Sequence, residues 1–482
     1  MNKIPDSRRP TDRNGKALGL SRREALKCGL AALGFSALPG GVMFAAPSGW
    51  KAPKKPNLVF GVLSDTHLMT GWDGVSPHRG YPHKYIISAF SYFKQRAVDA
   101  IVHLGDAAHR GQAREIEFHV EALKKVFGEG RLPKLLLVAG NHEWFGDCER
   151  VRKIWPEQKD WKEHALCADF PALWKRAWGE PYKEVWHQEV KGYHFFGRHW
   201  DVDEKRLSDL VNDNAAACRL SGKKPFFILS HKRNHFACNS ALKAFPNAVA
   251  FFGHWHQSNA DWKTVFFDSF GGFFPNIQCG ACRMDGGNAL DASESFLKAR
   301  PAEDKQGAHQ NKVPSRQGMV VSVYDDMVVF ERHEFGEGGK LGPDWVLPVE
   351  GERGKGKKHP FSREELTKKI GAPQFPPRAK IEVAKTKDGA VNVVIPLANA
   401  NAGSRPFAYD VAVVGDDPKA RLFKSVYWEG CNLGVGHEPD GGRTTLTIPA
   451  SELPAGKVLT FAVRPLSSLG TKGKAISAKF RA

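Results

Sequence analysis

The chain lacks a long, uninterrupted apolar segment of the kind that crosses a membrane. Its best candidate, residues 28–44, is only weakly hydrophobic and is broken by Pro39 and by four glycines. This composition makes a poor membrane span, and an uncleaved signal anchor is the alternative interpretation of the stretch. We therefore expect no stable membrane span after the N-terminal segment is cleaved.

Cysteine is scarce as well, with eight residues among 482. If Cys28 is removed with an N-terminal signal, seven remain, and an odd number leaves at least one thiol that is free or pairs between chains. Cys279 and Cys282 could form a redox pair, but the helix-opening context of such a pair does not follow them. A structural disulfide or two reduced core thiols is the better interpretation.

Acidic residues are outnumbered by basic ones, 52 against 70, which gives a net charge of +18. This charge suits anionic substrates and polyanionic surroundings but says nothing about the fold. We recognise no nucleic-acid module and no dense stripe of basic and aromatic residues, so nothing supports nucleic-acid binding beyond the charge. The length allows two or three domains.

The N-terminal segment is typical of a targeting sequence. Residues 21–27 contain Arg22-Arg23 and resemble a twin-arginine export signal. The weakly hydrophobic stretch follows, and then Ala45-Ala46-Pro47 offers a cleavage region. We therefore expect residues 1–46 to be a signal peptide, the twin-arginine machinery to be a partner, and the protein to be periplasmic or secreted.

Five polar motifs each end a short apolar run that predicts a buried strand. The runs are 59–63, 100–104, 135–139, 226–229 and 249–252. In the same order, the motifs are Asp65-Thr66-His67, Gly105-Asp106, Gly140-Asn141-His142-Glu143, His231 and Gly253-His254-Trp255-His256.

These positions predict a metal site. A ligand at the end of each strand places all five motifs on one edge of a sheet, where α/β sheets bind ligands. Imidazoles, carboxylates and one amide suit Zn, Mn or Fe far better than a structural thiolate site does. Each motif alone is common. The alternative to a metal site is that these positions are ordinary turn residues and hydrogen-bonded histidines. Five motifs in this order are a much more specific pattern.

The set resembles the calcineurin-like metallophosphoesterases over roughly residues 55–345. The resemblance implies two metal ions, of Mn, Zn or Fe. It assigns Asp65, His67, Asp106 and His256 to one ion, and Asp106, Asn141, His231 and His254 to the other. Asp106 would then bridge the two ions roughly 3.5–4 Å apart, and a water with a lowered pKa would attack the phosphorus, so no side-chain nucleophile is needed.

Three further residues are candidates for catalysis. His142 follows the ligand Asn141 and should face the substrate, either to protonate the leaving oxygen or to stabilise charge. Glu143 would orient that imidazole, or would be an exposed loop carboxylate. DNA-repair nucleases of the superfamily carry a histidine at the position of His109 that faces the phosphate; a surface histidine on a turn is the alternative. The purple acid phosphatases carry a metal-binding Tyr there, so His109 argues against an iron–tyrosinate centre.

The remaining pattern predicts an α/β domain built as a two-sheet β-sandwich flanked by helices, over residues 55–349. Helices are expected at 85–98, 114–127 and 204–217. Further strands are expected at 264–268, 276–279, 319–324 and 327–331, the last two joined by a hairpin turn at Asp325-Asp326. Residues 144–200 hold seven of the 13 tryptophans. Most of these are interpreted as the core of a small subdomain rather than a substrate-stacking cap, with Trp144 and Phe145 nearest the site.

The last part of the chain predicts a separate module. Residues 350–375 are expected to be a linker, because 351–358 consist largely of Gly and Lys. Residues 376–482 contain short alternating runs that predict an all-β immunoglobulin/fibronectin-like sandwich, and 461–474 resemble the final strands of a fibronectin type III domain. The expected strands are 380–384, 391–395, 409–414, 444–448, 458–463 and 475–480.

Together these features predict an exported dinuclear-metal phosphoesterase. The substrate would be a small phosphate ester or a phosphorylated envelope polymer. His109 favours a phosphodiester slightly, and a phosphomonoesterase of the same fold is the first alternative. The second is a cell-surface binding protein with a vestigial metal site, which the complete ligand set disfavours.

Overall fold

The computed structural model describes residues 55–70, 83–130, 132–143, 170–200, 202–256, 258–260, 264–267, 271–282, 316–336, 338–349, 358–398, 405–415, 421–432, 434 and 436–481. The expected signal peptide, and Trp144 with Phe145, lie outside these ranges. No helix in the described ranges combines the length and the apolar composition needed to cross a membrane.

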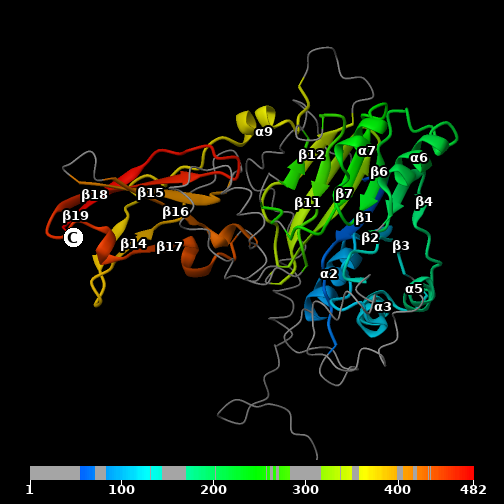
Figure 1. The fold of residues 1–482 in the computed structure, drawn as a ribbon, viewed down its shortest axis with the longest axis horizontal. Helices are drawn as coiled ribbons and strands as arrows, with labels where there is room; N and C mark the ends of the chain where they lie inside the picture. The colour runs from blue at the N-terminus through cyan, green and yellow to red at the C-terminus, as the bar shows by residue number, and fades with distance from the viewer. Residues whose placement is uncertain are drawn as a thin grey trace, which may run out of the picture. The chain divides into compact units, whose positions relative to one another are not determined.

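The first sheet carries the strands that end at the first three motifs (Figure 1). Its order is β12-β11-β10-β1-β2-β3, in which β1, β2 and β3 are parallel and the others pair antiparallel. The predicted hairpin is confirmed, because Tyr324 pairs with Met327 across Asp325-Asp326. The strands are β1 (Leu58–Leu63), β2 (Ala100–His103), β3 (Lys134–Leu137), β10 (Gln317–Tyr324), β11 (Met327–Glu334) and β12 (Trp345–Pro348).

The second sheet carries the strands that end at the last two motifs. Its order is β4-β5-β6-β7-β9-β8, with β5, β6, β7 and β9 parallel. The β4–β5 hairpin was not expected from the sequence. The strands are β4 (Val185–Val190), β5 (Tyr193–Arg198), β6 (Phe226–Ser230), β7 (Ala248–Phe252), β8 (Val265–Phe266) and β9 (Asn276–Gln278).

The two sheets share one buried apolar core. Phe60 of β1 lies at its centre, with ring centroids 5.4 Å from Phe195, 5.0 Å from Phe227 and 6.0 Å from Phe251 of the second sheet. All four rings are fully buried, and their edge-on geometry is the favourable one for aromatic pairs. The predicted mixed α/β architecture with facing sheets is therefore confirmed for this domain.

Helices pack against both sheets. α2 (His83–Gln95) and α3 (Ala113–Phe127) share an apolar cluster with β1 and β10, and α5 (Phe170–Trp178) packs with α3 and β3. α6 (Glu204–Asn214) and α7 (Phe236–Ala241) share a cluster with β5, β6 and β7 of the second sheet. The helices predicted at 85–98, 114–127 and 204–217 correspond to α2, α3 and α6.

One helix lies inside the stretch expected to be a linker. α9 (Arg363–Ile370) is capped by Ser362, whose side chain accepts the Glu365 N–H. Its Leu366 and Ile370 are buried in the core shared by the two large sheets. The described part of 350–375 therefore differs from a solvated connector, because its apolar side chains complete that core.

The described residues of the C-terminal module form two β-sheets and three short 3-10 helices, Glu429–Asn432, Pro439–Gly442 and Ala450–Glu452. A three-stranded sheet, β13-β14-β17, and a four-stranded sheet, β16-β15-β18-β19, contribute side chains to one apolar core that includes Tyr409 and Phe461. β16 was not expected from the sequence. The strands are β13 (Glu382–Lys385), β14 (Val391–Ile395), β15 (Ala408–Val414), β16 (Arg421–Tyr427), β17 (Thr444–Ile448), β18 (Val458–Leu466) and β19 (Ile476–Arg481).

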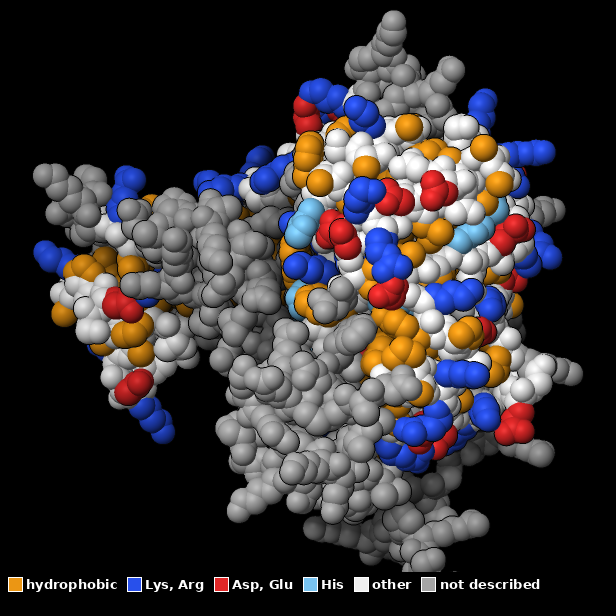
Figure 2. Space-filling view, turned by 45° about the vertical axis from the view of Figure 1, so that its right-hand side comes forward, with side chains coloured by type: hydrophobic (Ala, Val, Ile, Leu, Met, Phe, Trp, Pro, Cys, Tyr) orange, Lys and Arg blue, Asp and Glu red, His pale blue; other side chains and the backbone are white. Residues whose placement is uncertain are grey.

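Positive charge is dispersed on the face drawn in Figure 2. Among the described residues of that face, Lys and Arg side chains alternate with Asp and Glu side chains rather than gathering into one basic patch. Although the net charge is +18, the described part of this face therefore has no concentrated basic patch that would suit a polyanion.

A buried histidine ties the second sheet to the first beneath the ligand motifs. His199 follows β5, and its Nδ1 accepts the Ala139 N–H at 2.7 Å, while the Trp200 N–H donates to the Ala139 carbonyl at 3.0 Å. Burial lowers the pKa of His199 to about 3, so the ring stays neutral and keeps its acceptor at neutral pH. This contact fixes the backbone directly before Gly140-Asn141.

This contact should make the fold sensitive to acid. An unfolded histidine titrates near 6.5, whereas folded His199 titrates at about 3. Neutral His199 makes its full contribution to the free energy of unfolding above pH 6.5. That contribution falls as the pH drops from 6.5 toward 3, by roughly 1.4 kcal/mol per pH unit. His199→Asn keeps an acceptor near Nδ1 and removes the titration. Denaturant unfolding between pH 7.5 and 5, in chelator, should show a shallower loss of stability in this variant.

His437→Asn is the matched control, because His437 is an exposed histidine of the C-terminal module. It should keep the parent pH slope. A His199→Asn protein whose unfolding free energy falls with pH as steeply as the parent's would show that His199 does not carry this acid sensitivity.

Candidate metal centre

The ligand motifs converge from two sheets rather than from one. Asp65, Asp106 and Asn141 follow β1, β2 and β3, while His231 and His254 follow β6 and β7. The prediction that all five motifs lie on one edge of a single sheet is therefore wrong in this detail. The carboxyl ends of the parallel strands of both sheets face the same region, so the ligands still meet.

The first ligand group contains Asp65, His67, Asp106 and His256. One ligating atom from each lies within 4.8 Å of the others, and all four residues are buried. The Nε2 atoms of His67 and His256 are 3.1 Å apart, and His256 Nε2 is 3.2 Å from a carboxylate oxygen of Asp65. His67 Nε2 lies 3.7 Å from Asp106 Oδ2.

The second group contains Asp106, His231 and His254, again within 4.8 Å. His231 Nε2 is 3.3 Å from Asp106 Oδ2 and 3.1 Å from the amide oxygen of Asn141. Asp106 thus belongs to both groups. The structure brings together all seven predicted metal ligands, with the shared carboxylate between them.

The backbone at these ligands is strained. Asp65, His67, Asp106, His254 and His256 have φ values of 51°, 44°, 53°, 72° and 50°. A side chain in this left-handed region costs free energy, and such residues persist only where the surroundings enforce them. Five of the seven ligands therefore have a backbone conformation that costs free energy and that the geometry of the site requires.

Two motif glycines make the close approach possible. A Cβ on Gly140 would lie 2.2 Å from Asp106 Oδ1, and a Cβ on Gly253 would lie 1.8 Å from Ser64 Oγ. Neither position can accept a side chain without displacing Asp106 or the hydroxyl beside Asp65. The glycines of Gly-Asn-His and Gly-His-x-His are therefore steric requirements of the centre.

Neighbouring groups orient the ligands. The Asp65 carboxylate accepts the His254 N–H at 2.9 Å and the Ser64 hydroxyl at 2.5 Å, and Asp106 Oδ1 accepts the His142 N–H at 2.9 Å. His231 Nδ1 lies 2.7 Å from the Leu104 carbonyl, so Nδ1 carries the proton. That assignment leaves Nε2 of His231 directed at Asp106 and Asn141 as the metal-binding nitrogen.

Glu143 has a role that neither prediction described. It is buried, and its carboxylate accepts the N–H groups of Asp106, Ala108 and Gly140 at 2.9, 2.9 and 2.5 Å. Burial, followed by the charge of Asp106, raises the pKa of Glu143 to about 7, against the effect of these donors. Glu143 therefore joins the Gly-Asp loop to the Gly-Asn-His loop, and its predicted role is corrected accordingly.

The orientation of His142 comes instead from His109. His142 Nδ1 lies 2.6 Å from the His109 carbonyl, and the two rings stack with centroids 5.4 Å apart. His142 Nε2 is 3.9 Å from Asp106 Oδ2, and the ring is 4.4 Å from that of His67. His109 is half-buried with its ring 5.5 Å from His67, so it lies beside the centre rather than on a distant surface.

The buried charges are mutually balanced. Burial raises the pKa of Asp106, but the imidazoles of His231 and His142 outweigh burial and hold it well below its usual range. Burial lowers the pKa of His231, yet Asp106 and Asp65 raise it to about 9. Metal binding at His231 therefore has to displace a proton, which makes affinity depend on pH.

The donor set fits a pair of metal ions. Two carboxylates, four imidazoles and one amide converge from strained, buried positions, and no thiolate is among them. Nitrogen and oxygen donors of this kind suit Zn, Mn or Fe. Cys279 and Cys282 lie nearby in the fold as free, fully buried thiols, which is one of the two interpretations that the sequence favoured.

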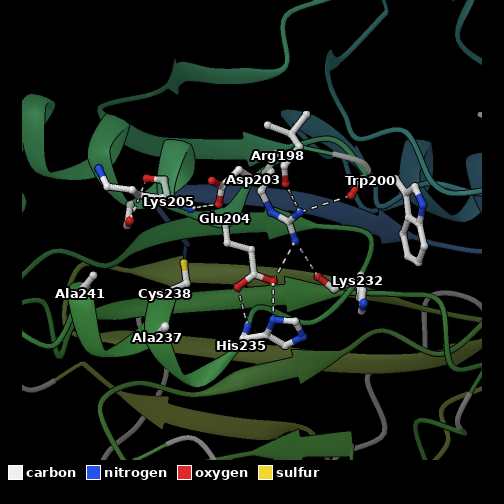
Figure 3. Close-up of a pocket in the computed structure, with 12 residues that line it drawn as sticks. Arg198, Trp200, Asp203, Glu204, Lys205, Lys232, His235, Ala237, Cys238 and Ala241 are labelled. Atoms are coloured by element: carbon white, nitrogen blue, oxygen red, sulfur yellow. Dashed lines mark hydrogen bonds and ion pairs between the residues drawn. The ribbon is translucent and has the colours of Figure 1, made fainter.

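A pocket of about 790 Å³ is lined by residues that follow β5 and β6 and by residues of α6 and α7 (Figure 3). Trp200 lines the pocket and also packs against the ligands, with its ring 4.9 Å from His254 and 5.5 Å from His231. The Lys232 ammonium lies 5.6 Å from the Trp200 ring centroid. The sequence analysis missed Trp200 as a site residue because the strand β5 that precedes it was not predicted.

Arg198 organises the wall of this pocket. Its guanidinium lies 3.6 Å from Glu204 (Figure 3). It also donates to the Val202 carbonyl at 2.7 Å and to Asn234 Oδ1 at 3.3 Å. Arg198 is 3% exposed, so these contacts hold the loops after β5 and β6 together rather than offer a charge to a ligand. The pocket is also lined by Lys205, which is paired with Asp209 at 2.6 Å, and by Lys232, together with the carboxylates Asp203 and Glu204.

Comparison with known proteins locates the domain. Residues 58–258 match the model of the calcineurin-like phosphoesterase family, and the predicted metallophosphoesterase domain is thereby confirmed over this part of the chain. No curated protein matches the chain.

Solved structures resemble it distantly. A dimetal phosphatase from Danio rerio is 12% identical with a TM-score of 0.36, covering 61% of this chain and 100% of that one. A purple acid phosphatase from yellow lupin is 9% identical with a TM-score of 0.38, covering 61% and 55%. A phosphoesterase from E. coli is 11% identical with a TM-score of 0.25, covering 61% and 100%.

Proposed function

We propose that this chain is a dinuclear-metal phosphoesterase that hydrolyses a phosphate ester. The observation that carries the proposal is the placement of Asp106 in both ligand groups, since a shared carboxylate is what holds two ions close enough to act on one phosphate. When bound, the ions supply Lewis-acid activation of the phosphate and of a water molecule. The two ions are proposed to be Mn, Zn or Fe.

His142 is the proton donor in this proposal. Because its Nδ1–H is held by the His109 carbonyl, the proton is exchanged at Nε2, the nitrogen nearer to Asp106. A carbonyl acceptor on Nδ1 also stabilises the charged ring before it releases that proton. His142 belongs to neither ligand group but clusters with His67 of the first group and with His109, which suits protonation of a leaving oxygen.

A phosphodiester is the favoured substrate, on the placement of His109. Its ring stacks on His142 and joins His67 and His142 in a cluster whose nitrogens lie within 4.8 Å. His109 is a second imidazole beside His142. It can bind the phosphate oxygen that carries the second ester group of a diester. The alternative is a phosphomonoesterase with the same ligands. A binding protein with a vestigial site is disfavoured, because a decayed centre should have lost at least one ligand.

The pocket beside Trp200 supplies a place for the rest of the substrate. Its indole forms a wall next to His254, and the Lys232 ammonium lies 5.6 Å from the ring centroid. An ester with a flat leaving group fits such a wall better than a bare alkyl phosphate does.

We also propose export, which the Arg22-Arg23 motif supports. The twin-arginine machinery would be the partner, and a small phosphate ester or a phosphorylated envelope polymer the substrate. The C-terminal module is proposed to be fibronectin type III-like, which its three-stranded and four-stranded sheets around one core support.

His142→Ala should lower kcat roughly 10²–10⁴-fold while leaving both metal ions bound, because the ring donates a proton without holding an ion. The assay is a panel of phosphomonoesters and phosphodiesters with Mn, Zn or Fe, alongside metal analysis of the same samples. His437→Asn serves as the control. Unchanged kcat across the panel, or loss of metal equal to the loss of activity, would remove His142 from the role assigned here.

Trp200→Ala should lower kcat/KM about 3- to 10-fold for aryl esters and leave esters with small leaving groups nearly unchanged, because stacking is worth roughly 0.5–1.5 kcal/mol. Trp200→Phe should recover most of the loss. Phe423→Ala, at an exposed ring of the C-terminal module, is the control. An equal loss on aryl and methyl esters would mean that Trp200 supports His231 and His254 rather than binding substrate.

A further inference from the structure

The β4–β5 hairpin and the turn after α6 bring three metal-binding side chains together, away from the centre described above. In the hairpin register, His187 pairs with Phe196 and Glu189 pairs with His194. His187 and His194 are therefore diagonal neighbours on one face of the sheet. Cys218, four residues beyond the end of α6, reaches the same place; β4 and α6 lie side by side in Figure 1.

Their ligating atoms are already close. His187 Nε2 is 3.1 Å from His194 Nδ1 and 3.8 Å from Cys218 Sγ, and all three atoms lie within 4.8 Å of one another. Each side chain is half-buried, so the cluster is partly shielded and still reachable from solvent.

We propose that His187, His194 and Cys218 bind one Zn²⁺ ion at a site separate from the dinuclear centre. Two imidazoles and a thiolate are a donor set that zinc prefers, and three protein ligands leave a fourth position for water or for the nearby Glu189 carboxylate. The thiolate distinguishes this site chemically from the dinuclear centre, whose ligands are all nitrogen and oxygen.

The surrounding structure holds the ligands in place. The His187 ring stacks on Phe196 with centroids 4.6 Å apart and planes at 13°, and the Cys218 N–H donates to the Asn214 carbonyl at 2.9 Å. The strand pairing fixes His194. Little rearrangement is needed to draw the three atoms around an ion, which favours binding.

A cysteine binds zinc as the thiolate. The ion must therefore displace the thiol proton of Cys218, so affinity should rise with pH.

An ion here would join two elements that otherwise meet through side-chain packing. The hairpin supplies two ligands and the turn after α6 supplies the third, while the start of α6 lines the pocket beside Trp200. A ligand that binds only the folded protein stabilises it, so zinc should raise the thermal midpoint of the parent.

The test uses the full chain, stripped of metal and titrated with Co²⁺ and then Zn²⁺. Cobalt bound to a thiolate gives a charge-transfer band that nitrogen and oxygen ligands do not give. We expect this band in the parent at one equivalent per chain, its displacement by Zn²⁺, and its loss in both Cys218→Ser and His194→Asn. Zinc content should fall by one equivalent in each variant, and the rise in thermal midpoint with zinc should shrink.

Two control variants separate this site from the dinuclear centre. Asp106→Asn should keep the band, so failure of the proposed function leaves this test intact, and His437→Asn should match the parent. Circular dichroism checks that each variant is folded. A parent without the band, a band that persists in folded Cys218→Ser, or unchanged zinc content in both variants would each overturn the site.

Discussion

Two buried carboxylates govern the architecture around the ligand motifs. Asp65 and Asp106 are removed from water, and an isolated buried carboxylate would cost more free energy than a domain can offset. Cationic or cation-binding groups must therefore surround them. The imidazoles that meet this requirement come from both sheets, so the sheets have to end at the same place. The buried aromatic core around Phe60 holds them there.

The strained loops are the second consequence of that constraint. Left-handed backbone at five ligands, and glycines that a Cβ would push into Asp106 and Ser64, are tolerated because other contacts fix the loops. Glu143 supplies three of these contacts through the N–H groups of Asp106, Ala108 and Gly140. The residue next to His142 in sequence thus acts on the backbone beneath the centre, and the carbonyl of His109 sets the His142 ring.

Sequence reasoning succeeded where a residue's chemistry is local. Each ligand stands directly after a run of Val, Ile or Phe, so the strands and the ligand set were predictable together. Prediction from the sequence failed where a residue's role depends on a contact with a segment that is distant in the chain. Nothing beside Glu143 indicates that its acceptors face three N–H groups, and the half-buried strand β4, with polar residues among its apolar ones, has no clean alternation. The helix α9 was predictable, because Ser362 followed three residues later by Glu365 is a capping pattern, but the Gly/Lys run before it suggested a linker throughout.

The central claim is that Asp106 bridges two metal ions. Anomalous diffraction from crystals of the full chain soaked in Mn²⁺ tests it most directly. The account predicts two manganese peaks roughly 3.5–4 Å apart, one on each side of the Asp106 carboxylate, and the loss of at least one peak in Asp106→Asn. A single peak in the parent, or two peaks that Asp106 does not join, would contradict it.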